Sequence, residues 1–225
     1  YDSGIRTPFL IARLGTIKPA VTDSLISSID ISATILELAG ARKDKRIQGV
    51  SFASVLEDPQ SKTRDFVFAE HNWHVYQAHE RMVRFGNFLY IRNNFPNQPN
   101  LSYESDDRTP AGAELWGAHA AGKTNPKQYQ IFANPCPAEE LFQVKEDPHQ
   151  LTNLADDSKH AKTLQRARAL LTKWANQTGD TVPVNPTPNR HDPPRIEDGK
   201  ILPPGKVKTR NPHAEMPGSS KNATK

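Results

Sequence analysis

The strongest constraint on the fold is a two-residue link, Gly86-Asn87, between two short apolar segments. The segments, residues 81–85 and 88–92, are rich in aromatic and branched side chains. Such a link between such segments predicts a β-hairpin. Two further segments of the same kind, residues 66–69 and 140–144, extend the prediction to a small antiparallel sheet.

A helix is predicted over residues 158–176, because apolar side chains recur there at helical spacing. Ser158 can cap its first turn, and Gly179 lies just past its end. The stripe is formed by Leu164, Ala167, Leu171 and Trp174. We expect this helix to lie across the small sheet and to cover one of its faces.

The first 60 residues have a different pattern. Residues 5–14 contain an apolar core without alternation, which is typical of a strand buried on both faces of a mostly parallel sheet. Asp30, at an N-cap position, and Gly40, past the end, bracket a predicted helix. We therefore predict the end of an α/β domain over residues 1–60 and a sheet subdomain over residues 61–180. The start at Tyr1, with no leader before the first apolar segment, predicts that the chain begins inside a domain.

The remaining segments are irregular or rich in proline. Residues 93–138 are expected to form a long loop that is functional or mobile. Nine prolines fall in residues 181–225, so this segment is predicted to be disordered or draped over the body. It also carries the whole formal net charge of +4, which argues against a nucleic-acid surface on the folded part. No apolar run approaches the roughly 18–20 residues that span a bilayer, so no transmembrane segment is expected.

An ordered series of motifs resembles the C-terminal half of the sulfatase family, over residues 1 to about 180. The series begins with Tyr-Asp-Ser-Gly-Ile-Arg-Thr-Pro and ends with Asn-Leu-Ala, in residues 1–8, 27–30, 34–40, 48–52, 140–142, 146–149 and 153–155. Residues 68–74 with 81–84 are most similar to the heparan N-sulfatase (sulfamidase) type. The resemblance implies that residues 1–60 end a large alkaline-phosphatase-like α/β domain. It also implies a periplasmic or secreted protein.

The resemblance implies a hydrolase that uses calcium and a formylglycine made within a Cys/Ser-x-Pro-Ser-Arg motif. Cys136 is the one cysteine, and its Cys-Pro-Ala-Glu-Glu context departs from that motif. The acidic pairs Asp106-Asp107 and Asp156-Asp157 fit solvated loop charge better than metal ligation. We therefore expect no catalytic residue and no metal ligand in this chain. They are expected upstream of Tyr1, in the missing N-terminal half of the same protein, so this part alone is predicted to be inactive.

The best functional candidates within the chain are His71, His74, His79 and Arg81. They follow a predicted strand, and imidazoles with a guanidinium can bind sugar hydroxyls or a sulfate. The alternative interpretation is a polar surface loop with a packed tryptophan. The His-x-x-His spacing of the first two also occurs in metal sites, but no third ligand is evident.

The predicted function is hydrolysis of a sulfate ester or sulfamate on a sulfated carbohydrate, with residues 61–180 closing one side of the active-site cleft in the intact protein. One alternative is a non-catalytic, carbohydrate-contacting or truncated sulfatase-like module. Another is a phosphoester hydrolase of the same superfamily, which uses a serine or threonine nucleophile. The isolated chain is expected to be poorly soluble, because residues 9–12 would expose an apolar strand and an unpaired edge.

Overall fold

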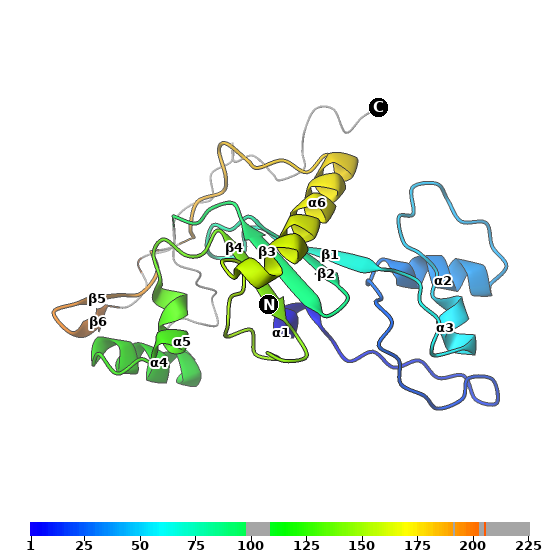
Figure 1. Ribbon diagram of the computed structural model, residues 1–225, viewed down its shortest axis with the longest axis horizontal. Helices are drawn as coiled ribbons and strands as arrows, with labels where there is room; N and C mark the ends of the chain where they lie inside the picture. Colours follow the sequence, from blue (N-terminus) through cyan, green and yellow to red (C-terminus); the bar gives the residue numbers. More distant parts are fainter. Residues whose placement is uncertain (98–108, 191, 203–204, 206–225) are drawn as a thin grey trace.

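A computed structural model of the chain describes residues 1–97, 109–190, 192–202 and 205. Its centre is an antiparallel sheet of four strands in the order β1-β2-β3-β4 (Figure 1). The strands are β1 Phe66–His71, β2 Glu80–Phe85, β3 Phe88–Asn93 and β4 Glu139–Gln143. Gly86, at the turn between β2 and β3, has a φ of 49°, which a glycine adopts readily. The predicted hairpin and the small sheet are both confirmed.

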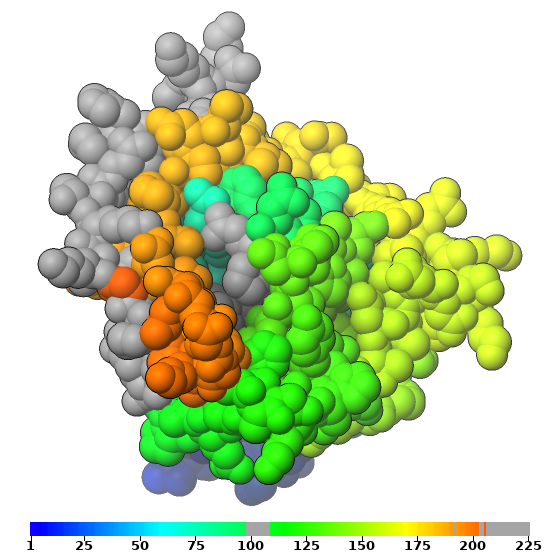
Figure 2. All heavy atoms as spheres, turned by 90° about the vertical axis from the view of Figure 1, so that its left-hand side faces the viewer, coloured from blue at the N-terminus to red at the C-terminus, as the bar shows by residue number. Residues whose placement is uncertain are grey.

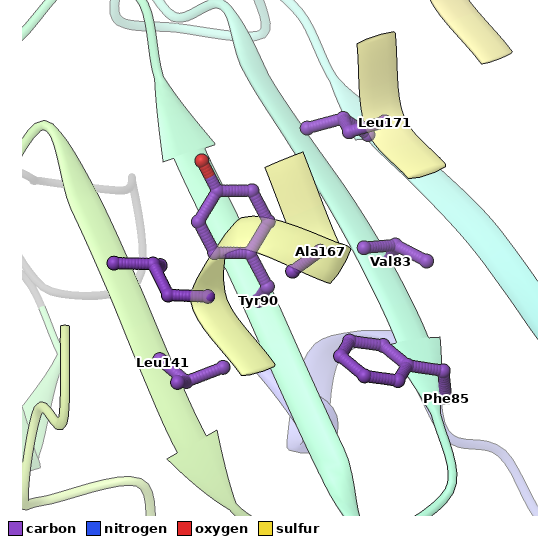
Figure 3. Packing of buried hydrophobic residues seen from close by; sticks show 7 residues of the cluster. Val83, Phe85, Tyr90, Leu141, Ala167 and Leu171 are labelled. Carbon is purple, nitrogen blue, oxygen red and sulfur yellow. The ribbon is translucent and has the colours of Figure 1, made fainter. Parts of the chain in front are cut away.

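Helix α6, Ala161–Thr178, crosses one face of this sheet (Figure 1). It follows a 3-10 turn, η3 Ser158–His160, and ends at Gly179, which has a left-handed φ of 70°. Figure 3 shows side chains of the helix and of the strands converging in one apolar core. That core is formed by Val83, Phe85, Tyr90, Leu141, Leu164, Ala167 and Leu171. The prediction of a helix that covers one face of the sheet is confirmed.

The opposite face of the sheet has its own apolar cluster of Met82, Leu89, Ile91 and Phe142. Tyr1, the residue before the short helix α1, Asp2–Ile5, contacts this face. The ring of Tyr1 lies edge-on to Phe142 at 5.9 Å between centroids. The N-terminal residues are thus held to the face that α6 leaves open.

Two helices lie beyond the β1 edge of the sheet (Figure 1), α2 Asp30–Leu38 and α3 Ala53–Glu57. Asp30 is the first residue of α2 and not its cap, which corrects the predicted position. Its buried carboxylate accepts hydrogen bonds from Arg64 Nε (2.8 Å), Ser27 N (2.9 Å) and Val50 N (2.7 Å). Burial opposes ionisation, but these donors outweigh it and hold the pKa of Asp30 below its ordinary value.

The predicted strand over residues 5–14 is wrong for this structure. Ile5 ends helix α1, and residues 6–13 follow an extended path that pairs with no other described strand. Leu10 and Leu14 are 95% and 99% exposed. A strand needs a neighbour to satisfy its backbone hydrogen bonds, and the edges of the described sheet are β1 and β4. The expected exposure of an apolar segment is, however, confirmed at these positions.

The irregular regions contain more structure than the sequence indicates. Residues 109–132 form three short helical elements, and the segment after 190 forms a second, two-stranded sheet. The elements are α4 Pro110–Ala120, α5 Pro126–Tyr129, η2 Gln130–Phe132, β5 Arg195–Glu197 and β6 Lys200–Leu202. The hairpin of β5 and β6 (orange) lies against the green lobe that contains α4 (Figure 2). Within the part of the chain described, no helix combines the length and apolarity needed to cross a membrane.

Candidate substrate-binding site

The predicted site residues lie where β1 ends and β2 begins. His71 is the last residue of β1 and pairs in register with Glu80, the first residue of β2. Residues 72–79 connect them without regular secondary structure and are called the β1–β2 loop below. The four candidates therefore occupy one end of the sheet, but their side chains point into different surroundings.

Arg81 lies fully buried on the α6 side of the sheet. Its guanidinium makes a bidentate ion pair with Asp180, from Nε to Oδ2 (2.7 Å) and from Nη2 to Oδ1 (2.8 Å). Nη1 donates to Asn72 Oδ1 (3.1 Å) and to the carbonyl of Glu80 (2.8 Å). This geometry is that of a strong buried ion pair, and it fixes the start of the loop to the residue that follows α6.

His79 is also buried, and its two ring nitrogens have different partners. Nε2 lies 3.0 Å from the carbonyl oxygen of Thr181, and Nδ1 lies 2.8 Å from the amide nitrogen of Asn94. The neutral ring accepts from the Asn94 amide at Nδ1, while Nε2 lies between the Thr181 carbonyl and Arg81 Nη2, which is 2.8 Å away. Burial, together with the charge of Arg81 beside it, lowers the pKa of His79 and favours this neutral form.

His71 and His74 are the exposed members of the predicted set. His71 Nδ1 lies 2.7 Å from Glu80 Oε2, and its side chain is 45% exposed. The structure thus separates two exposed imidazoles from two buried side chains that hold the loop. Substrate contact by any of the four stays a prediction.

Glu140 is a buried carboxyl near Glu80 that the sequence analysis missed. It lies buried on the sheet face opposite α6, where the Tyr1 hydroxyl donates to its Oε1 at 3.0 Å. Burial raises the pKa of Glu140 to about 7. The nearby negative charge of Glu80 also raises the pKa, whereas the hydrogen bond from Tyr1 lowers it. Alternation along β4 places residue 140 on the face opposite Leu141, but it does not show how deeply the carboxyl is buried.

The family's cofactors do not fit the residues described here. Cys136 is buried, its sulfur accepts from Asn93 Nδ2 at 2.9 Å, and burial raises the pKa of its thiol. Among the described residues, no group of three or more histidine, cysteine, aspartate or glutamate side chains could hold a metal ion. Asp157 instead caps the turn before α6 by accepting from Lys159 N at 2.9 Å. The other acidic pair, residues 106–107, lies outside the described residues. No chemical step through calcium or formylglycine is therefore derived from this chain.

The second group that sequence reasoning missed is the segment just after α6. Asp180 pairs with Arg81, and the residues that follow run along the β1–β2 loop. Trp73 Nε1 donates to the carbonyl of Pro188 at 2.7 Å. Residues 181–190 are therefore draped over the body, which was one of the two alternatives for them. Residues 206–225 of the predicted tail lie outside the described part.

Comparison with known proteins shows that the chain is similar to the C-terminal part of sulfatases. Residues 1–89 match the family model for the C-terminal part of N-sulphoglucosamine sulphohydrolase. An ulvan-active sulfatase of Formosa agariphila is 34% identical over 183 residues, which is 80% of this chain and 30% of that protein. A delta 4,5-hexuronate-2-O-sulfatase of Bacteroides thetaiotaomicron is 26% identical over 204 residues, which is 86% of this chain and 34% of that protein.

The chain also resembles solved structures over part of its length. A putative sulfatase from Bacteroides thetaiotaomicron has a TM-score of 0.43 and 24% identity, over 66% of this chain and 24% of that one. The chain spans about a third of the length of the curated relatives that it matches.

Proposed function

Because the chain belongs to the sulfatase family, as a C-terminal part, we propose that the whole protein hydrolyses sulfate groups on a glycan. The observation that carries this proposal is the 34% identity to the ulvan-active sulfatase over 80% of the chain. The bond that is broken is a sulfate ester or a sulfamate. The substrate of the whole protein is a sulfated carbohydrate, in keeping with the names of the relatives.

We assign this chain the role of binding the glycan. His71 and His74 present imidazoles at the exposed end of the sheet, and imidazoles can exchange hydrogen bonds with sugar hydroxyls and sulfate oxygens. Arg81 and His79 lie beneath them with their polar atoms engaged by protein groups. We therefore propose that the exposed pair contacts substrate and that the buried pair positions the loop.

The chain by itself is proposed to be inactive. Its cysteine is a buried, protonated thiol, and its described acidic residues do not gather into a metal site. A nucleophile and a metal-binding group must then come from elsewhere in the complete protein. The 34% identity to an ulvan-active sulfatase over 80% of the chain favours a sulfatase over a module that only binds carbohydrate.

The test compares the chain with the complete gene product, including whatever the gene encodes ahead of Tyr1. Sulfate release is measured by ion chromatography on ulvan, on a 2-O-sulfated hexuronate and on an N-sulfated glucosamine. We expect release from the complete product on at least one substrate and none from the chain alone. Absence of release from all three by the complete product would overturn the proposal.

Point variants in the same assay test the loop. His71→Ala and His74→Ala are expected to raise KM by about three- to tenfold, because each removes a hydrogen bond to the bound glycan. His149→Ala is the matched control, since His149 is an exposed histidine in the turn after β4. Unchanged KM in both loop variants would remove the loop from the site.

A further inference from the structure

The β1–β2 loop needs support from outside itself to keep one shape. Residues 72–79 are longer than the usual hairpin connection of about two to five residues, and they contain no regular secondary structure. Val75 and Tyr76 within the loop are nevertheless almost fully buried. Their partners must therefore come from another part of the chain.

Residues 180–190, called here the C-terminal strap, are anchored below the loop at their first two positions. Asp180 forms the bidentate ion pair with Arg81, and the carbonyl oxygen of Thr181 lies 3.0 Å from His79 Nε2. Arg81 and His79 are buried, so these contacts are shielded from competing water. Buried side chains thus hold the first two residues of the strap in place.

The far end of the strap contacts the loop directly. Asn189 Oδ1 accepts from the backbone nitrogen of Gln77 at 2.6 Å, and Arg190 N donates to the carbonyl of Val75 at 2.8 Å. The indole nitrogen of Trp73 donates to the carbonyl of Pro188 at 2.7 Å. These bonds satisfy backbone groups of the loop that its own residues do not satisfy.

The chain beyond the strap extends the same packing. Ile196 and Ile201, from the β5–β6 hairpin, pack against the cluster of Val75, Tyr76 and Trp116. Figure 2 shows the orange residues of this hairpin lying beside the green lobe that contains α4. The loop is therefore enclosed between the strap, the hairpin and the sheet.

We propose that the C-terminal strap is part of the glycan-binding site, because it holds the β1–β2 loop in the conformation that presents His71 and His74. This inference rests on the proposed function. Asn189 and Trp73 are positioning residues in it: they touch the loop and its support and not the glycan. A preformed loop binds more tightly than one that must be ordered by its ligand. The prolines of the strap also favour a preformed conformation, because proline restricts the backbone of the unbound chain.

The test uses the full chain with substitutions that leave both buried anchors intact. Asn189→Ala removes the acceptor for the Gln77 amide, whereas Asn189→Asp keeps an acceptor oxygen at the same place. Val184→Ala is the control within the strap, because the Val184 side chain is 95% exposed. Hydrogen exchange of the Gln77 amide reports on the loop, and titration with a sulfated disaccharide reports on the site.

For Asn189→Ala we expect exchange at Gln77 to rise about tenfold or more and the Kd to rise about three- to tenfold. The melting temperature should change little, and Asn189→Asp should restore both values. Unchanged exchange, or faster exchange with an unchanged Kd, would overturn the role of the strap. If the unsubstituted chain fails to bind the disaccharide, the glycan-binding role proposed for this chain falls, while the exchange result still decides whether the strap holds the loop.

Discussion

Replacing Glu140 with glutamine should change how the stability of the chain depends on pH. The pKa of Glu140 in the folded chain is about 7, against an ordinary value of 4.5. One unit of pKa corresponds to about 1.4 kcal/mol, so a difference of about 2.5 corresponds to about 3 kcal/mol. That is the free energy by which the buried, ionised carboxylate destabilises the fold relative to the protonated form.

The sign of the effect follows from proton binding. Between pH 4.5 and about 7 the folded chain holds a proton on Glu140 that the unfolded chain has lost. The contribution of this proton to the free energy of unfolding is therefore fully present below pH 4.5 and is lost as pH rises through 7. Glu140→Gln cannot ionise, and its amide oxygen can still accept from Tyr1. Relative to that of the unsubstituted chain, the free energy of unfolding of the variant should therefore rise by about 3 kcal/mol between pH 4 and pH 8.

Urea unfolding followed by tryptophan fluorescence at pH 4, 5, 6, 7 and 8 measures the free energy of unfolding of both proteins. Their difference reports on residue 140, because the other titrating groups are common to both. Glu139→Gln is the control from the neighbouring position. A hydrogen bond from Arg168 holds the pKa of Glu139 below its ordinary value of 4.5, so the stability of this variant relative to the unsubstituted chain should fall as pH rises to about 5 and should then stay constant up to pH 8. Parallel curves for Glu140→Gln and the unsubstituted chain across this range would refute the reasoning.

Three further outcomes are expected. Gly49→Ala should lower the free energy of unfolding by several kcal/mol, since a Cβ there would lie 2.1 Å from the Ile29 carbonyl oxygen. Gly117→Ala is its control: a Cβ there meets nothing within 4 Å, so this variant should be neutral or stabilising. Asp180→Asn should cost about 3 kcal/mol in the same urea assay, because the buried Arg81 guanidinium then keeps only the half-exposed Glu70, 3.6 Å from Nη2, as a charged partner; a loss under about 1 kcal/mol would contradict this. The chain incubated alone with the three sulfated substrates should release no sulfate, and any release would contradict its assignment as a non-catalytic part.

Local patterns correctly identified much of the sheet subdomain. Residues 81–85 and 88–92 form the hairpin, and the stripe ending at Trp174 packs into the core, where its ring stacks on Phe68 at 5.4 Å. Gly179 ends α6 as predicted. These features depend on residues a few positions apart, whose period reports the buried face directly. Residues 5–14 were interpreted wrongly for the opposite reason: an apolar run signals burial but does not supply the neighbouring strand that burial requires.

The sequence by itself determined which residue types reach the end of β1 and the start of β2, and its motif series was sufficient to indicate the family. Only the tertiary structure decided that His79 and Arg81 are buried while His71 and His74 are exposed. The deciding contacts are the ion pair between Arg81 and Asp180, 99 residues apart in the chain, and the bonds of the C-terminal strap. Contacts over such separations leave no periodic trace, because they arise when independently formed elements pack and buried polar groups must find partners.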